Sequence, residues 1–181
     1  MEKSLLTDKI RFAVLGCGGV SKAHFMGITA TKEEELVVVC DAVPARAEEF
    51  GQLYKVRAYS DYDELLAQPD VDVICVCTPS GMHPEQAIRA AEAGKHVICE
   101  KPVAIRVEDA HRMNEAFRRN NVKLAAILPR HMSPAAQFVK GLIEQGKLGK
   151  LSHCSGYSLF YRDQSYYDTG AAPGNTTAAA R

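Results

Sequence analysis

Residues 10–21 read I-R-F-A-V-L-G-C-G-G-V-S and are the most informative stretch of the chain. The apolar run ends at Gly16, and Gly18 and Gly19 follow before a helical pattern begins. This order predicts a strand, a tight turn and the start of a helix. Such a turn lets the backbone approach a pyrophosphate, and the helix N-terminus attracts its charge. We therefore predict that Gly16, Gly18, Gly19 and Val20 bind a nucleotide, although a glycine turn can also serve packing alone.

The composition restricts the classes of partner. The 181 residues include 22 Lys+Arg and 22 Asp+Glu, which gives a formal net charge of zero. A neutral chain does not suggest nucleic acid or an anionic membrane as a partner. No apolar run approaches the ~20 residues of a membrane-spanning helix, and residues 1–9 do not resemble a signal peptide. Five of the six cysteines fall at or inside apolar strands, without a C-x-x-C pair, which predicts buried thiols in a reducing cytoplasm and no metal site.

Apolar strands alternate with helices along the first 128 residues. The pattern predicts strands over 11–16, 36–40, 56–59, 71–78, 96–99 and 122–128. It predicts helices over 20–31, 44–54, 61–68, 84–93 and 107–120. This alternation is typical of an α/β fold with a doubly wound parallel sheet, the Rossmann fold, in the strand order 3-2-1-4-5-6. Residues 1–129 are therefore expected to form a dinucleotide-binding domain.

The pattern changes after Pro129. A helix is predicted over 134–145 and a strand over 151–161, and residues 171–181 contain almost nothing to bury. One helix and one strand cannot form a core. Residues 130–170 are therefore expected to begin an incomplete α+β substrate or oligomerisation domain, and 171–181 to be a disordered tail. The lone strand is expected to lie as an exposed edge, to pair between chains in a homo-oligomer, or to be poorly ordered.

An acidic residue ends the second predicted strand. Asp41 lies 20 positions after Ser21, where a carboxylate can accept hydrogen bonds from a ribose diol. An acid there would repel the 2′-phosphate of NADP, so we predict NAD as the cofactor. NADP stays an alternative, because Arg46 could meet that phosphate or stack on the adenine. Each residue also has a simpler interpretation, as a solvated strand-end aspartate and a solvated helix arginine.

Two further strands end in polar residues at the edge where open α/β sheets bind ligands. After the fourth strand, C-T-P-S-G-M-H-P at 77–84 offers Thr78, Pro79 and Ser80 to the pyrophosphate or ribose. His83 opens the next helix beside them, either as a cofactor contact or as a capping or packing residue. After the fifth strand, C-E-K-P at 99–102 presents Lys101, which could polarise an alcohol or carbonyl oxygen during hydride transfer. Alternatively, Lys101 is a surface lysine paired with a glutamate.

These stretches together resemble the glucose–fructose oxidoreductase/inositol dehydrogenase family, Gfo/Idh/MocA. The resemblance covers about residues 10–165 and rests on G-C-G-G-V-S-K-A-H (16–24), C-D-A-V-P (40–44), C-T-P-S-G-M-H-P-E-Q-A (77–87) and A-G-K-H-V-I-C-E-K-P (93–102). It implies an NAD(P)-dependent dehydrogenase that oxidises or reduces a hydroxyl of a sugar-like polyol or nucleotide sugar. The third glycine position, however, holds Ser21.

The resemblance also implies roles for single residues. Lys101 would hydrogen-bond the reacting oxygen and assist proton transfer. Glu100 would hold Lys101 or the nicotinamide ribose, and Pro102, often cis in the family, would direct the lysine. Arg130 and Tyr161 would lie where the substrate cleft begins.

One family feature is absent from the sequence. Relatives continue beyond this length and carry a D-x-x-x-H pair whose histidine works with the lysine. After Lys101, the histidines at 111, 131 and 153 have no aspartate four positions before them. The chain is therefore expected to be truncated, to bind cofactor and to be catalytically incomplete. The alternative is a non-catalytic dinucleotide-binding module that senses redox state or serves as a partner subunit.

Overall fold

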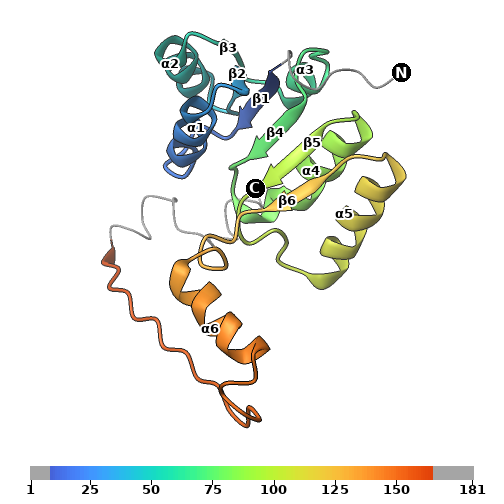
Figure 1. Ribbon diagram of the computed structural model, residues 1–181. Coiled ribbons are helices and arrows are strands. Elements are labelled where there is room, and N and C mark those ends of the chain that lie inside the picture. Colours follow the sequence, from blue (N-terminus) through green and yellow to red (C-terminus); the bar gives the residue numbers. More distant parts are fainter. Residues whose placement is uncertain (1–8, 165–181) are drawn as a thin grey trace.

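A six-stranded parallel sheet forms the centre of the computed structural model, which describes residues 9–164 (Figure 1). Its strands are β1 (Ile10–Leu15), β2 (Glu34–Cys40), β3 (Arg57–Tyr59), β4 (Val73–Val76), β5 (His96–Cys99) and β6 (Leu124–Ala126). They lie in the order β3-β2-β1-β4-β5-β6, as predicted. The predicted fourth strand, 71–78, is longer than β4, because β4 pairs with β1 only over Val73–Val76. The residues beyond this pairing belong to the loops at the two edges of the sheet.

Helices cover both faces of this sheet. They are α1 (Ser21–Ala30), α2 (Pro44–Tyr54), α3 (Tyr62–Leu66), α4 (His83–Glu92) and α5 (Val107–Arg119), and a 3₁₀ turn at Ser80–Met82 precedes α4. A further helix, α6 (Pro134–Glu144), follows β6 and lies apart from the sheet (Figure 1). Alternate residues of β1 point to opposite faces. Phe12 and Val14 pack with residues of α1 and α2, whereas Ala13 and Leu15 pack with residues of α3, α4 and α5. Figure 1 shows these two groups of helices on opposite sides of the strands. The sheet is therefore doubly wound.

An aromatic cluster fixes α1 against α2. Phe25 of α1 is completely buried, and its ring lies 4.3 Å from that of Tyr54 and 5.4 Å from that of Phe50, measured between centroids. Aromatic pairs of this kind contribute about 0.5–1.5 kcal/mol beyond their buried area. The cluster holds α1 and, with it, the glycine turn at its N-terminus.

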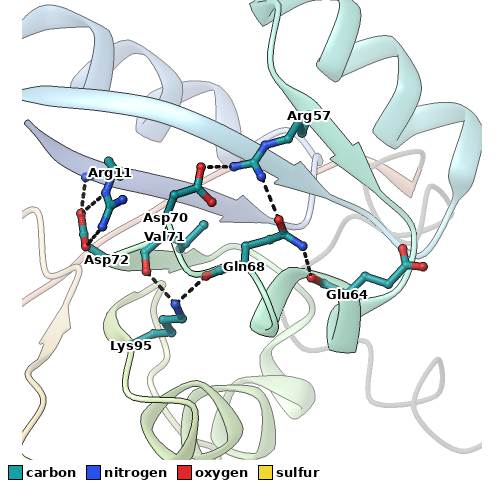
Figure 2. A network of polar contacts seen from close by, with 8 residues as sticks. All are labelled: Arg11, Arg57, Glu64, Gln68, Asp70, Val71, Asp72 and Lys95. Atoms are coloured by element: carbon teal, nitrogen blue, oxygen red, sulfur yellow. Dashed lines mark hydrogen bonds and ion pairs between the residues drawn. The ribbon is translucent and has the colours of Figure 1, made fainter.

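A network of polar contacts lies where β1, β4 and β5 begin, at the end of the sheet opposite the glycine turn (Figure 2). Arg11 donates from its backbone N–H and its guanidinium to both carboxylate oxygens of Asp72, at 2.7–2.9 Å. The buried ammonium of Lys95 donates to the carbonyls of Gln68 and Val71, at 2.7 and 2.8 Å. Figure 2 shows that these contacts converge on the loop between α3 and β4. They set where β4 begins and therefore where its carboxyl end presents Thr78.

The Arg11–Asp72 pair predicts an acid dependence of stability. The hydrogen bond from the Arg11 guanidinium holds the pKa of the Asp72 carboxyl below its ordinary value of 3.8. A carboxyl with a depressed pKa stabilises the fold above pH 3.8, and this stabilisation is lost as pH falls through the lowered pKa. Asp72→Asn should therefore reduce the free energy of unfolding at pH 7 by about 0.5–1 kcal/mol, because the pair is partly exposed.

Urea unfolding at pH 7, 4 and 2.5 measures this effect. The difference between wild type and Asp72→Asn should shrink toward zero at pH 2.5. Glu108→Gln, which alters an exposed pair with Arg106 at 3.7 Å, is the control and should change stability by less than about 0.5 kcal/mol. A difference that stays constant at all three pH values would exclude the ionised carboxylate as its cause.

The segment after α6 corrects one prediction. Residues 151–161 form no strand, and their side chains are exposed; Tyr157 and Leu159 are 90% and 93% accessible. Within residues 9–164, no strand lies beside this segment to accept its backbone hydrogen bonds, so its alternating sequence is insufficient to form a ladder. The helix predicted over 134–145 is confirmed as α6, which has no buried residue. Association between chains through this segment stays a prediction, and the tail 171–181 lies outside the described residues.

None of the helices in residues 9–164 is long and apolar enough to cross a membrane.

Candidate functional site

The carboxyl ends of β1, β2, β4 and β5 form one continuous edge. Backbone hydrogen bonds extend the pairing just beyond the strands: Gly16 N–H donates to Cys40, Cys77 N–H to Leu15 and Glu100 N–H to Val76, at 2.7–3.0 Å. Parallel strands place their carboxyl ends on the same side, so the loops that follow them are neighbours. The sheet therefore brings Gly16, Asp41, Thr78 and Lys101 to a single edge.

The glycine turn requires a glycine at its first position. Gly16 has a φ of +93°, and a Cβ placed on it would lie 2.9 Å from the backbone carbonyl of Cys77. By contrast, no atom lies within 4 Å of a Cβ built on Gly18 or Gly19. Gly16 thus packs β1 against the loop after β4, while Gly18 and Gly19 leave open space beside their backbone. This open space suits a pyrophosphate, which the backbone could approach closely.

Ser21 occupies the third position of the glycine motif without disturbing the turn. Its buried hydroxyl donates to the carbonyl of Gly18 at 2.6 Å. The preceding residue, Val20, provides no side-chain cap for α1. The first amide groups of a helix need an acceptor from outside the helix, and an anion can supply one. The residues present therefore fit a dinucleotide phosphate.

Asp41 is held as part of this turn. The residue is only 6% exposed. Its carboxylate accepts hydrogen bonds from the backbone N–H of Cys17 at 2.8 Å and from that of Val43 at 2.9 Å. The half-exposed guanidinium of Arg46 lies 3.4 Å from the same carboxylate. Asp41 thus joins the glycine turn to the end of β2 and places a negative charge there. Its contact with a ribose and the contact of Arg46 with adenine or phosphate stay predictions.

The loop after β4 is held from within the chain. The hydroxyl of Thr78 hydrogen-bonds the side-chain oxygen of buried Gln86, and the carbonyl of Thr78 lies 2.8 Å from Nε2 of His83. The other ring nitrogen of His83 lies 2.9 Å from the carbonyl of Pro102. The ring is 1% exposed and therefore connects two loops of the edge. Direct contacts of Thr78, Pro79, Ser80 and His83 with a cofactor stay predictions.

The loop after β5 presents the lysine. The side chain of Lys101 is exposed, whereas Glu100 beside it is buried. One carboxylate oxygen of Glu100 accepts the backbone N–H of Lys101 at 3.1 Å, and the other lies 3.0 Å from Nε2 of His24. Glu100 therefore holds the backbone of Lys101, one of its two expected roles. The Lys101–Pro102 peptide bond is cis, as the family resemblance implies.

The predicted substrate residues lie in the segment beyond β6. Tyr161 is 86% exposed, and the guanidinium of Arg130 lies 5.7 Å from the ring centre of Phe160, the residue before Tyr161. Arg130 and Tyr161 thus belong to adjoining parts of one segment, and their substrate contacts stay predictions.

In residues 9–164, no group of three or more His, Cys, Asp or Glu side chains could hold a metal ion.

Four of the five buried cysteines lie next to this edge, and all five are free thiols. Burial raises the pKa of Cys17, Cys40, Cys75 and Cys99 to about 12, and it raises that of Cys77 further. Since the thiolate is the reactive form, these thiols should be inert at pH 8. Cys154 is the exposed cysteine.

Ellman's reagent at pH 8 should therefore react rapidly with one thiol per chain and with the other five only as the chain unfolds. Cys154→Ser should abolish the rapid phase and leave the slow phase unchanged. Rapid reaction of two or more thiols in folded wild-type protein would show that solvent reaches cysteines other than Cys154.

Two contributors to the edge were absent from the sequence prediction, namely His24 and Gln86. His24 shares one face of α1 with Ser21, Phe25 and Ile28, all of which are buried. The i, i+3, i+4, i+7 spacing of these positions is the signal that could have identified it. Gln86 lies in the C-T-P-S-G-M-H-P-E-Q-A stretch, but nothing in its spacing indicates a bond to Thr78.

Comparison with known proteins identifies the family. Residues 10–128 match the family model for the Gfo/Idh/MocA oxidoreductases, described as an oxidoreductase family with an NAD-binding Rossmann fold. The chain is 30% identical over 142 residues to inositol 2-dehydrogenase from Rhizobium meliloti, an alignment that covers 78% of this chain and 43% of the relative.

Solved structures show the same similarity. The WlbA dehydrogenase from Bordetella pertussis, in complex with NADH and UDP-GlcNAcA, superposes with a TM-score of 0.83 and 38% identity, covering 89% of this chain and 50% of that one. A 3-ketoreductase from Actinomadura kijaniata, in complex with TDP-benzene and NADP, gives a TM-score of 0.71 and 26% identity, covering 77% and 44%. The chain thus spans about half the length of these relatives. With the family model matching more than half of its residues, the chain belongs to the Gfo/Idh/MocA oxidoreductase family.

Proposed function

We propose that this chain supplies the dinucleotide site and the catalytic lysine of an NAD(P)-dependent dehydrogenase acting on a sugar-like polyol or nucleotide sugar. The observation that carries the proposal is the meeting of the glycine turn, Asp41 and Lys101 at one edge of the sheet. When bound, the nicotinamide cofactor supplies or accepts the hydride. The substrate class is supported by relatives named for inositol and solved with UDP-GlcNAcA.

Each residue has a defined task in this proposal. The open backbone at Gly18 and Gly19, with the N-terminus of α1, binds the pyrophosphate. Asp41 accepts from a ribose hydroxyl and disfavours a 2′-phosphate, so NAD is the preferred cofactor. Lys101 hydrogen-bonds the reacting oxygen. Its ammonium donates a proton to that oxygen when a carbonyl is reduced, and its neutral amine accepts the hydroxyl proton when an alcohol is oxidised. The chain lacks the D-x-x-x-H pair of the family after Lys101, so we propose that it binds cofactor but turns over slowly by itself.

The buried free cysteines support a place in a reducing cytoplasm. Their burial adds nothing to the choice of substrate.

Paired measurements on Lys101→Met test the catalytic assignment. NADH affinity, followed by the fluorescence of the nicotinamide, should change less than about threefold, because the cofactor is held mainly at the other strand ends. Transfer of deuterium from labelled NADH to a keto-sugar nucleotide, detected by mass spectrometry, should fall about 100-fold or more. An unchanged transfer rate would contradict the role of Lys101. NADH binding without transfer in both proteins would favour the non-catalytic, redox-sensing or partner module.

A further inference from the structure

We infer that His24 is a positioning residue for Lys101 and acts through the carboxylate of Glu100. This inference rests on the proposed function, in which Lys101 meets the reacting oxygen. It assigns a task to a buried histidine on the cofactor-side helix α1, far along the chain from the lysine that it positions.

The side chains of His24 and Glu100 are both buried and are in contact. Nε2 of His24 lies 3.0 Å from Oε1 of Glu100, and each side chain is 8% exposed. A carboxylate can only accept hydrogen bonds, so the ring donates from Nε2. A charge-assisted bond of this kind is stronger than one between neutral groups. The imidazole therefore supplies a hydrogen-bond donor to Oε1 of the buried carboxylate and fixes the orientation of that carboxylate.

The carboxylate of Glu100 also contacts the backbone of the lysine. Oε2 of Glu100 accepts the backbone N–H of Lys101 at 3.1 Å, so one carboxylate holds α1 with its first oxygen and the lysine backbone with its second. On the other side of Lys101, the carbonyl of Pro102 lies 2.9 Å from the ring of His83. The backbone on both sides of the lysine is therefore fixed while its side chain stays exposed.

Fixing this backbone matters because a flexible lysine side chain has many rotamers. The position from which the side chain starts limits where its ammonium can lie. A misplacement of about 1 Å at a reacting group can reduce a rate by about 100-fold. His24 lies on the helix whose N-terminus faces the phosphate site, so the pair also sets the lysine relative to the bound cofactor.

Hydrogen exchange at the backbone amide of Lys101, measured by NMR on the whole chain without cofactor, tests the inference. His24→Leu should accelerate this exchange about tenfold, because Glu100 loses the donor that orients it. His24→Gln should keep the rate within about threefold of wild type, since a glutamine amide can donate from nearly the position of Nε2. In a Glu100→Ala background, His24→Leu should have no further effect on this amide.

Two controls separate positioning from a general loss of stability. Amides of the core strands, at Val14 and Ile74, report global unfolding, and the Lys101 rate is compared with theirs in each variant. His111→Leu changes an exposed histidine of α5 and should leave the Lys101 amide unchanged. If His24→Leu and His24→Gln behave alike at Lys101, or if the effect of His24→Leu persists without Glu100, the inference is overturned.

This experiment is independent of the proposed function. If the wild-type chain does not bind NADH but the His24 variants change the Lys101 amide as expected, only the proposed function is contradicted. If the wild-type chain binds NADH but His24→Leu leaves exchange at the Lys101 amide unchanged, only the positioning role of His24 is contradicted.

Discussion

Gly16→Ala should destabilise the fold by about 2–5 kcal/mol and abolish dinucleotide binding. The new Cβ would lie 2.9 Å from the backbone of Cys77, which is shorter than any normal contact, and the φ of +93° is unfavourable for alanine. A left-handed backbone costs about 1–2 kcal/mol for a residue with a Cβ, and overpacking costs about 1–3 kcal/mol more. The atoms that the new Cβ would meet belong to the backbone of the loop after β4, so they cannot move aside as the end of a flexible side chain could.

Gly18→Ala is the matched control for this prediction. No atom lies within 4 Å of a Cβ at Gly18, so the free energy of unfolding should stay within about 1 kcal/mol of wild type. The methyl group would, however, occupy the space assigned to the pyrophosphate and should weaken NADH binding tenfold or more. Urea unfolding and NADH fluorescence titration measure the two properties separately. Equal NADH affinity in Gly18→Ala and wild type would place the phosphates elsewhere.

Asp41→Ala should have the second largest effect, on both stability and cofactor affinity. The substitution leaves the N–H groups of Cys17 and Val43 without their acceptor. An unsatisfied buried N–H costs about 1–3 kcal/mol, and the two together about 2–4 kcal/mol, since one is only partly buried. Loss of the ribose acceptor should also weaken NADH binding at least tenfold, which corresponds to ~1.4 kcal/mol.

Asp41→Asn separates the two contributions of this residue. Its side-chain oxygen can still accept one of the two N–H groups, so the loss of stability should be smaller than in Asp41→Ala. The negative charge is removed, so affinity for NADPH relative to NADH should rise, with Arg46 close enough to meet the 2′-phosphate. Titration of the variant with both nucleotides measures this ratio. A ratio identical to that of wild type would show that the charge of Asp41 does not select the cofactor.

The fold could be predicted because its local signals agree. The apolar runs of β1, β2 and β4 are bounded by glycine, aspartate and proline, and the helices between them begin and end within a few residues of the expected positions. The parallel order then follows from the alternation of strands and helices. The exception is 151–161, because alternation predicts a strand only where another strand supplies partners, and none of the described residues does so.

The site was predictable only in its outline. Motif spacing placed Gly16, Asp41 and Lys101 at strand ends, and the sheet order made them neighbours. Spacing could not show that Glu100 faces His24 or that the ring of His83 lies between two carbonyls, because these contacts join residues up to 76 positions apart. Such contacts depend on how α1 and α4 pack on the sheet. The sequence determines that packing only through the whole core.

A titration of the uniformly ¹⁵N-labelled chain with NADH, followed by two-dimensional NMR, tests whether the carboxyl edge of the sheet binds the dinucleotide. We expect saturable binding in the micromolar to millimolar range typical of enzyme ligands. The amide shifts should cluster at Gly18, Gly19, Asp41, Ser80 and Lys101. A folded spectrum without saturable shifts at millimolar NADH, or shifts gathered away from the carboxyl ends of β1, β2, β4 and β5, would contradict a dinucleotide site at this edge.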